Sequence, residues 1–276
     1  MSLQNDKSQA AGFFARNPVF THAEFLSAHG AGGRRSAHTA NNILAHHLAA
    51  GHLVRVRRGL YATVPRTVEP EAAAVDPYLV ASKLTADAVV AYHAALQFHG
   101  KAYSVSNRFT YLTRRRARSF RYRQAEFVPV QLPAALRKLR LPDSGGGIRE
   151  QRHAGGLARV TTLERTLVDV LDAPEYGGGW EEIWRSLESV EFFDLDAVIA
   201  YALKLGSALT VARVGFFLEQ HRETLMVEEH HLEALRAHVP GQPRYLDRRR
   251  EPGKLVSRWN LVVPEHVLSR AWAEVP

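Results

Sequence analysis

Hydrogen-bonding side chains recur about one helical turn apart after a glycine-rich turn at residues 30–33. They are Arg35, His38, Thr39, Asn42 and His46. Residues three and four apart share one face of a helix, so these side chains form a stripe without the Glu/Lys mixture of a plain solvated face. Asn suits a bidentate contact with adenine and Arg one with guanine, while His and Thr reach base edges or phosphate. The spacing therefore predicts a helix that reads the major groove of DNA.

Four further arginines lie close to this stripe in sequence. Arg34 lies in the preceding turn, and three more follow in a segment that turns at Gly59. Guanidinium groups in such positions bind phosphates or enter the minor groove. The predicted DNA-binding set is Arg34, Arg35, His38, Thr39, Asn42, His46, Arg55, Arg57 and Arg58.

A second basic stretch, at residues 108–123, interleaves arginine with phenylalanine and tyrosine. Such a mixture suits nucleic acid, because bases stack on rings while guanidinium groups bind phosphates. The alternative is a solvated pair of strands with the rings turned inward. A smaller basic run around residues 244–254 allows the same two interpretations. The candidate second surface is Arg114, Arg115, Arg116, Arg118, Arg121 and Arg123.

Other chemistries have little support in the sequence. The pairs His46–His47 and His230–His231 are adjacent, and adjacent helical side chains diverge by about 100°, so neither pair chelates a metal well. The glycine triplets lack the Lys-Ser/Thr of a phosphate loop, and Gly-x-Ser-x-Gly is absent. A metal-dependent nuclease needs paired carboxylates beside a lysine, whereas Glu126 and Glu150 lie among arginines. We expect no catalytic residue, no metal, no cofactor and no enzymatic activity.

The elements that position the DNA-binding set follow from caps and periodicity. A short helix ends before Pro18, and Thr21 with Glu24 forms a capping box for a second helix. Ser36 caps a third helix over residues 37–50, which ends at Gly51. Two strands over 53–56 and 60–64 complete the order helix, helix, turn, helix, hairpin. The sequence thus predicts a winged helix-turn-helix domain at residues 1–66.

Residues 67–276 predict one larger mixed α/β domain with a helical C-terminal part, which makes the fold class α+β. We expect helices over 77–84 and 87–99, and strands over 108–113, 121–131, 148–153 and 157–160. Thr161 and Glu164 predict a capping box for the next helix. Further helices are expected over 180–190, 195–205, 210–221 and 228–238, and a last strand over 255–263.

Charge is distributed unevenly along the chain. The net charge is +8, with +6 on residues 1–66, +8 on 67–159 and −6 on 160–276. A basic front suggests a polyanionic partner, and the acidic helices suit a basic partner, although solvated helix faces are the commoner explanation. The chain has no cysteine, so disulfides and thiolate metal sites are excluded. No apolar run approaches the roughly 18 residues of a membrane span, so we expect a cytoplasmic protein without a membrane partner.

Three segments make the chain resemble the AbiEi family of antitoxins from type IV toxin–antitoxin systems. They are Gly-His-Leu-Val-Arg-Val-Arg-Arg-Gly-Leu-Tyr at 51–61, Asp-Pro-Tyr-Leu at 76–79 and Thr-Leu-Glu-Arg-Thr-Leu-Val-Asp at 162–169. The resemblance implies a winged-helix domain that represses its own operon by binding inverted repeats in double-stranded DNA. It also implies a C-terminal domain that counters a nucleotidyltransferase-like toxin. The alternatives are a module that neutralises a protein partner without operator recognition, and a plain transcription factor with no toxin.

Overall fold

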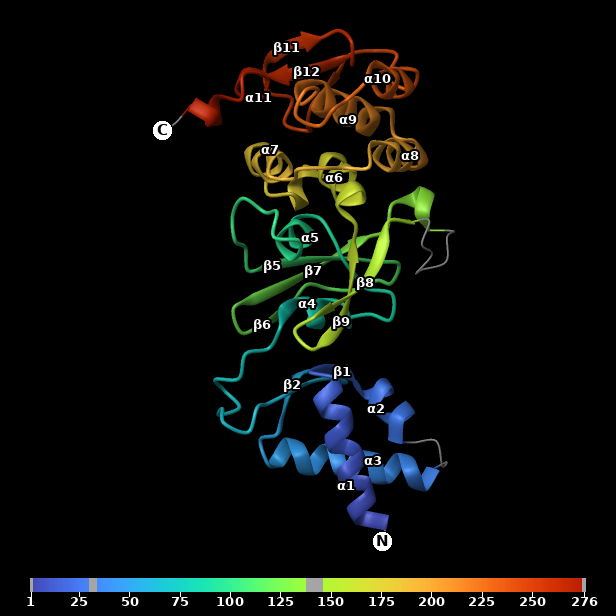
Figure 1. Ribbon diagram of the computed structural model, residues 1–276, viewed down its shortest axis with the longest axis vertical. Coiled ribbons are helices and arrows are strands. Elements are labelled where there is room, and N and C mark those ends of the chain that lie inside the picture. The colour runs from blue at the N-terminus through green and yellow to red at the C-terminus, as the bar shows by residue number, and fades with distance from the viewer. Residues whose placement is uncertain (1, 30–33, 138–145, 275–276) are drawn as a thin grey trace.

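The protein is a mixed α+β chain built in three tiers. The computed structural model describes residues 2–29, 34–137 and 146–274, and side chains for 9–29, 37–137 and 146–272. Along its long axis lie an N-terminal tier of helices and a small sheet, a middle tier built on a six-stranded sheet, and a C-terminal tier that is mainly helical (Figure 1). Within these residues, no helix combines the length and the apolarity needed to cross a membrane.

The N-terminal tier has the order helix, strand, helix, helix, hairpin. Its elements are α1 (Ser2–Arg16), β1 (Val19–Thr21), α2 (His22–His29), α3 (Arg34–Ala49), β2 (Leu53–Arg57) and β3 (Leu60–Thr63). The strands form an antiparallel sheet in the order β1–β3–β2. The predicted capping box is present: the Glu24 amide donates to Thr21 Oγ1 at 3.2 Å, and the Thr21 amide donates to Glu24 Oε2 at 2.6 Å. The sequence does not predict β1, which is too short to show a pattern.

Both faces of this small sheet are covered. One face packs against α1, α2 and α3 through Phe20, Leu53 and Tyr61. The other face belongs to the apolar cluster of the middle tier through Val19, Val56, Leu60 and Ala62. Successive side chains of a strand point to opposite faces, so each strand supplies both clusters. The N-terminal tier is therefore docked on the middle tier by a continuous apolar contact, which fixes the orientation of α3.

The middle tier contains a mixed sheet with the strand order β6–β7–β5–β4–β9–β8. Pairs β5/β7 and β4/β9 are parallel, and the other neighbours are antiparallel. The expected strand at 108–113 and the expected hairpin at 148–160 are both present. The elements are α4 (Pro77–Ala81), β4 (Val89–Val90), α5 (His93–Phe98), β5 (Arg108–Thr113), β6 (Phe120–Tyr122), β7 (Ala125–Gln131), η1 (Ala134–Leu136), β8 (Ile148–His153) and β9 (Gly156–Thr161).

Two predicted elements of the middle tier are wrong. The expected helix over 87–99 is instead strand β4 followed by the shorter helix α5, because Val90 pairs with Tyr111 of β5 on one side and Val160 of β9 on the other. The expected strand over 121–131 is the hairpin β6–β7, which turns at Arg123 with a φ of +53°. Both errors arise because strand partners distant in sequence override the local pattern.

The C-terminal tier contains α6 (Leu163–Asp172), η3 (Pro174–Tyr176), α7 (Trp180–Glu188), α8 (Leu195–Leu205), α9 (Ala208–Gln220), α10 (Glu229–Arg236), β10 (Arg244–Tyr245), β11 (Gly253–Val256), β12 (Leu261–Pro264), α11 (Glu265–Leu268) and η4 (Ala271–Glu274). The four helices expected between residues 180 and 238 are present. The expected strand over 255–263 is wrong, because β11 and β12 pair as an antiparallel hairpin. The expected cap of α6 is also wrong: Thr162 caps the helix, and Thr161 is buried in β9.

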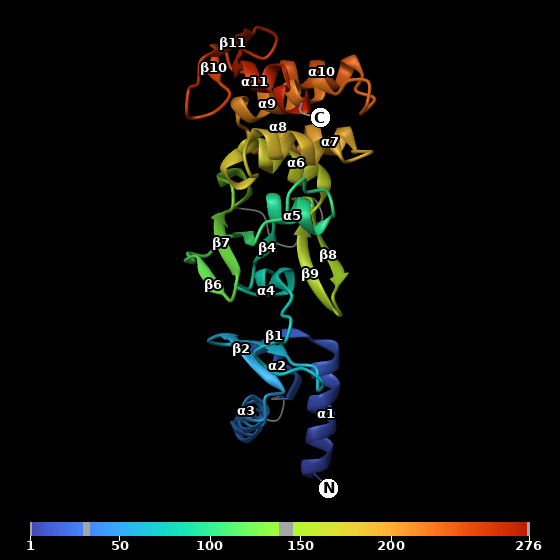
Figure 2. The same cartoon turned by 90° about the vertical axis from the view of Figure 1, so that its left-hand side faces the viewer.

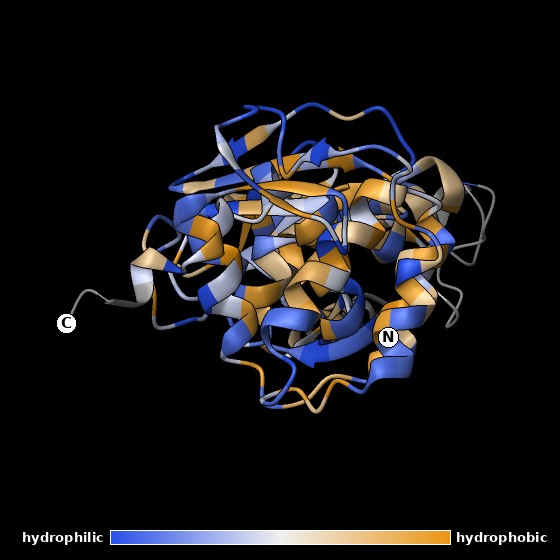
Figure 3. Ribbon diagram, turned by 90° about the horizontal axis from the view of Figure 1, so that it is seen from above, coloured by the Kyte–Doolittle hydropathy of each residue, from blue (hydrophilic) through white to orange (hydrophobic). Residues whose placement is uncertain are grey.

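One apolar core joins the middle and C-terminal tiers. Its members include Val89 and Leu112 from the sheet and Trp184, Phe217 and Trp259 from the C-terminal tier. Seen from above, hydrophobic ribbon occupies the centre of the molecule and hydrophilic ribbon its rim (Figure 3). The middle tier thus contributes to two clusters, one shared with the C-terminal tier and one shared with the outer face of the N-terminal sheet.

Candidate nucleic-acid interface

Helix α3 presents a polar face to solvent. Ala40 and Leu44 are buried against α1 and α2, with Ile43 and Leu48 packed at the edge of that core. On the opposite face His38, Thr39, Asn42 and His46 are exposed. In Figure 2, α3 lies on the side of the tier away from α1, with the β2–β3 hairpin above it. The structure therefore brings the described members of the predicted stripe together on one open surface.

Arg34 and Arg35 were predicted to join this surface. Their backbone belongs to the first turn of α3, whereas their side chains lie outside the described residues. Asn41, which the sequence analysis does not single out, is also exposed, and its Oδ1 lies 2.7 Å from Nε2 of His22 at the start of α2. This contact joins α3 to the start of α2.

The three arginines of the hairpin have different environments. Arg55 and Arg58 are exposed, whereas Arg57 is half-buried. The Arg57 guanidinium donates to the carbonyl of Leu84 at 2.9 Å and lies 5.9 Å from the ring centroid of Phe120. Arg57 thus ties the hairpin to the middle tier, which leaves Arg55 and Arg58 as the hairpin side chains open to a ligand.

The hairpin meets the second basic stretch in a groove of about 1000 Å³ between the N-terminal and middle tiers. We call this feature the basic groove. Its cationic residues come from four segments of the chain, and the only acidic side chains among the described residues that line it are Glu24 and Glu150. The basic residues that line it are Arg57, Arg58, Lys83, Arg115, Arg116, Arg118 and Arg159.

The arginines of the second basic stretch differ in their exposure and in their contacts. Arg115, Arg116, Arg118 and Arg121 are exposed. Arg123 is also exposed, but its guanidinium donates to the carbonyls of Pro70 and Ala73 and so holds the segment between the first two tiers. Arg114 is half-buried, with its guanidinium 3.5 Å from the Leu136 carbonyl. The groove therefore draws on only part of the predicted set: Arg115, Arg116 and Arg118.

Two groove residues missed by the sequence analysis are Lys83 and Arg159. Lys83 pairs with Glu24, and the Arg159 guanidinium donates to the carbonyl of Ala86 at 2.8 Å. Burial opposes ionisation of Glu24, but hydrogen bonds from Lys83 and Thr21 outweigh it and lower the pKa of this carboxyl group. Glu24 is accordingly an anion that neutralises Lys83, so the free positive charge of the groove resides mainly on its exposed arginines.

A carboxylate also supports the loop that carries these arginines. Asp87 accepts hydrogen bonds from the Arg114 amide at 2.7 Å and from the Thr113 hydroxyl at 2.8 Å. Burial would raise the pKa of Asp87, but these bonds and one from Thr85 outweigh it and lower the pKa. Asp87 therefore anchors the start of the 114–119 loop, which presents its arginines to the groove.

The carboxylates considered for a nuclease lie far apart in the sheet. Glu126 is on β7 and Glu150 is on β8, and strands β5, β4 and β9 separate them. In the sheet register, Glu126 is opposite Arg121 and Glu150 is opposite Arg159. This arrangement does not supply the paired carboxylates that two-metal hydrolysis requires.

One group of possible metal ligands occurs in the described part of the chain: Asp196, His230 and His231, with ligand atoms within 4.8 Å of one another. The Glu228 amide donates to Nδ1 of His231 at 3.1 Å. In the neutral ring the proton therefore sits on Nε2, the nitrogen that lies 3.9 Å from Asp196. The group forms a polar contact between α8 and α10.

Comparisons with known proteins give a structural likeness only. No family model matches the chain, and no curated protein matches it. Among solved structures, the chain is similar to the crystal structure of the RV2827C protein from Mycobacterium tuberculosis, with a TM-score of 0.53 and 19% sequence identity. The likeness covers 98% of this chain and 95% of the other. Two chains that match over nearly their whole length share the three-tier fold.

Proposed function

We propose that residues 1–66 are a winged helix-turn-helix in which α3 reads the major groove and the β2–β3 hairpin is the wing. The element order helix, strand, helix, helix, hairpin supports this assignment. The observation that carries it is the exposed stripe of His38, Asn42 and His46, spaced four residues apart along α3. Side chains with this spacing lie one above another on a helix and can reach successive base edges.

The basic groove extends the proposed DNA contact beyond the N-terminal tier. Arg58 of the wing lines the same groove as Arg115, Arg116 and Arg118 of the middle tier. Guanidinium groups along a groove suit phosphates of a duplex backbone, which position the protein without reading sequence. On this proposal α3 supplies specificity, and the groove supplies the salt-dependent part of the affinity.

We further propose that the protein is a transcriptional repressor that acts as an antitoxin, with its own operator as the DNA target. The antitoxin part depends on the resemblance of residues 51–61, 76–79 and 162–169 to AbiEi proteins. Co-expression tests it separately from DNA binding. The protein should restore growth to cells that express the neighbouring nucleotidyltransferase-like gene, and failure to do so would leave a plain repressor.

The test of operator binding is a fluorescence-anisotropy titration with DNA from upstream of the gene and with shuffled DNA, each at several salt concentrations. Wild-type protein should prefer the upstream DNA, and its affinity should fall steeply with salt. Arg58→Ala should lower the salt dependence of binding, whereas Arg236→Ala, at the exposed end of α10, is the control for an equal loss of charge. Equal affinity for both DNAs at physiological salt would show that α3 does not read an operator.

A further inference from the structure

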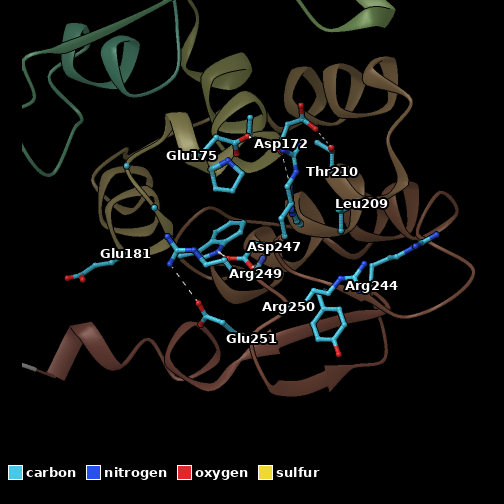
Figure 4. A pocket seen from close by; sticks show the side chains of 18 of the residues that line it. Asp172, Glu175, Glu181, Leu209, Thr210, Arg244, Asp247, Arg249, Arg250 and Glu251 are labelled. Atoms are coloured by element: carbon cyan, nitrogen blue, oxygen red, sulfur yellow. Dashed lines mark hydrogen bonds and ion pairs between the residues drawn. The ribbon is translucent and has the colours of Figure 1, made fainter. Parts of the chain in front are cut away.

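A cleft of about 1330 Å³ opens in the C-terminal tier (Figure 4). This tier lies at the end of the molecule opposite α3 (Figure 1). We call it the C-terminal cleft. Its walls come from the segment between α6 and α7, from the start of α9, and from the loop between β10 and β11. Arg213 and Trp180 line it and are only 4% and 9% exposed. The Arg213 guanidinium lies 5.5 Å from the ring centroid of Trp180, so an aromatic and cationic pair forms the buried wall.

Buried hydrogen bonds hold the loop that borders this cleft. Arg213 Nε donates to the Leu246 carbonyl at 2.7 Å, and Trp180 Nε1 donates to Asp247 Oδ2 at 3.0 Å. The other oxygen of Asp247 accepts from the Arg249 amide at 2.9 Å. These bonds fix the base of the loop, which then presents Arg248, Arg249 and Arg250 next to the cleft.

The unengaged hydrogen-bonding groups of the cleft are mainly guanidinium donors. Arg244 and Arg250 are exposed and form no side-chain hydrogen bond or ion pair with any residue that the structure describes. Arg248 and Arg249 are 95% and 82% exposed, and their nearest carboxylate oxygens lie 3.9 and 3.8 Å away. These distances exceed those of a charge-assisted hydrogen bond.

Most carboxylates of the cleft are already engaged. Asp172 accepts from the Thr210 hydroxyl, and Asp247 is bonded to Trp180. Glu181 pairs with Arg185 at 3.0 Å. Figure 4 shows Asp172 joined to Thr210 at one side of the cleft and Arg249 joined to Glu251 at another. Glu175 and Glu251 are the remaining carboxylates of the cleft, 3.9 and 3.8 Å from Arg248 and Arg249, and the four exposed arginines outnumber them.

We propose that the C-terminal cleft binds a phosphate-bearing small molecule of nucleotide size. Arginine presents donors in a fork that matches phosphate oxygens, and four exposed arginines around one cleft suit more than one phosphate group. Tyr245, which also lines the cleft, is 42% exposed and offers a ring face against which a base stacks. Because α3 lies at the other end of the chain, this proposal stands independently of operator binding.

The test uses the full chain with ATP, pyrophosphate, adenosine and a five-nucleotide single-stranded DNA as probes, measured by calorimetry and by tryptophan fluorescence. Trp180 and Trp272 both line the cleft, so an occupant should change their emission. ATP should bind in the micromolar range, pyrophosphate more weakly, and adenosine not measurably. The double variant R248A/R250A should weaken ATP binding by about tenfold for each guanidinium lost.

The matched control is R222A/R236A, which removes the same charge from exposed positions of the same tier that do not line the cleft. Its affinity for ATP should stay within about twofold of wild type. Both double variants should bind upstream DNA like wild type. This result separates failure of the ligand proposal for the C-terminal cleft from failure of the repressor proposal. Absence of ATP and pyrophosphate binding, equal weakening in both variants, or a preference of the cleft for the oligonucleotide over ATP would each overturn the proposal.

Discussion

The two ends of the molecule both expose basic or polar side chains, but on surfaces of opposite form. At the N-terminal end they lie along a helix and a hairpin and continue into the basic groove. At the C-terminal end four arginines surround a single cleft with a buried wall of Arg213 and Trp180. The same residue type thus suits an extended polyanion at one end and a compact anion at the other. The elements that carry the arginines, more than the charge itself, separate the two proposed ligands.

The sharpest test of this contrast is Asn42→Ala. If Asn42 makes the bidentate base contact, its loss should weaken operator binding about 5- to 150-fold, equivalent to about 1–3 kcal/mol, with little change for shuffled DNA. Asn107→Ala is the matched control, because Asn107 is an exposed asparagine on the middle tier. ATP binding at the C-terminal cleft should be the same in both variants. Equal loss of affinity for both DNAs would contradict a base-reading role of Asn42.

A comparison of two neighbouring arginines should separate structural support from ligand contact within the β2–β3 hairpin. Arg57→Ala leaves the half-buried Leu84 carbonyl without its donor and should lower the free energy of unfolding by about 1–3 kcal/mol. Arg58→Ala, on an exposed side chain, should change it by less than about 0.5 kcal/mol. Urea denaturation followed by circular dichroism measures both. Similar stability of the two variants would mean that the Arg57 contact does not attach the hairpin to the middle tier.

The C-terminal end should also respond to acid through a buried carboxylate. Glu182 Oε1 accepts from the Ser104 amide, His93 and the Ser186 hydroxyl, each at 3.0 Å. Burial opposes its ionisation, but the hydrogen bonds from Ser104 and His93 outweigh burial and lower the pKa of Glu182 below 4.5. Its contribution to stability is therefore complete above pH 4.5 and is lost as the pH falls through the lowered pKa of the folded state.

The measurement is the melting temperature of wild type, Glu182→Gln and Glu233→Gln from pH 7 to pH 3. The melting temperature of wild type should exceed that of Glu182→Gln at pH 7, and this difference should disappear as the pH falls below 4.5. The exposed Glu233 serves as the control for loss of one carboxylate from the same tier. A difference in melting temperature between wild type and Glu182→Gln that stays constant with pH would contradict a lowered pKa of Glu182 in the folded protein.

The smallest expected effect is on the salt dependence of DNA binding. Loss of one phosphate contact in Arg58→Ala should reduce the slope of log K against log salt by about one, with the preference for operator DNA unchanged. Arg116→Ala should do the same if the groove carries the duplex backbone. An unchanged slope for Arg116→Ala would restrict the DNA contact to the N-terminal tier.

Local patterns predicted some elements because their causes lie within a few residues. The capping box of Thr21 and Glu24 is present, and Gly51, expected to end α3, has a φ of +70° that glycine adopts without strain. Strand β4 could not be predicted in this way, because its two residues are held by β5 and β9. Periodicity cannot reveal a two-residue strand whose partners are distant in sequence.

The candidate sites also combine features that follow from the local sequence with features that depend on residues distant in sequence. The stripe of His38, Asn42 and His46 follows from helical spacing alone, and the structure leaves these side chains exposed. The different environments of Arg57 and Arg58 cannot be read from the local sequence, because they depend on the position of Leu84 in another tier. Likewise, Arg58 and Arg116 meet in one groove only because the sheet of the N-terminal tier buries its second face on the middle tier.

The sequence by itself determined the α+β composition, the polar face of the third helix and the basic front half of the chain, because periodicity, caps and charge are local properties. Only the tertiary structure decided which arginines support the fold, which line the basic groove and which border the C-terminal cleft. The physical reason is that a guanidinium group binds whichever acceptor lies within reach. The carbonyls of Leu84 and Ala73 come within reach of Arg57 and Arg123 only when the first two tiers are packed. The carbonyl of Leu246 comes within reach of Arg213 only when the segment after β10 packs on α9.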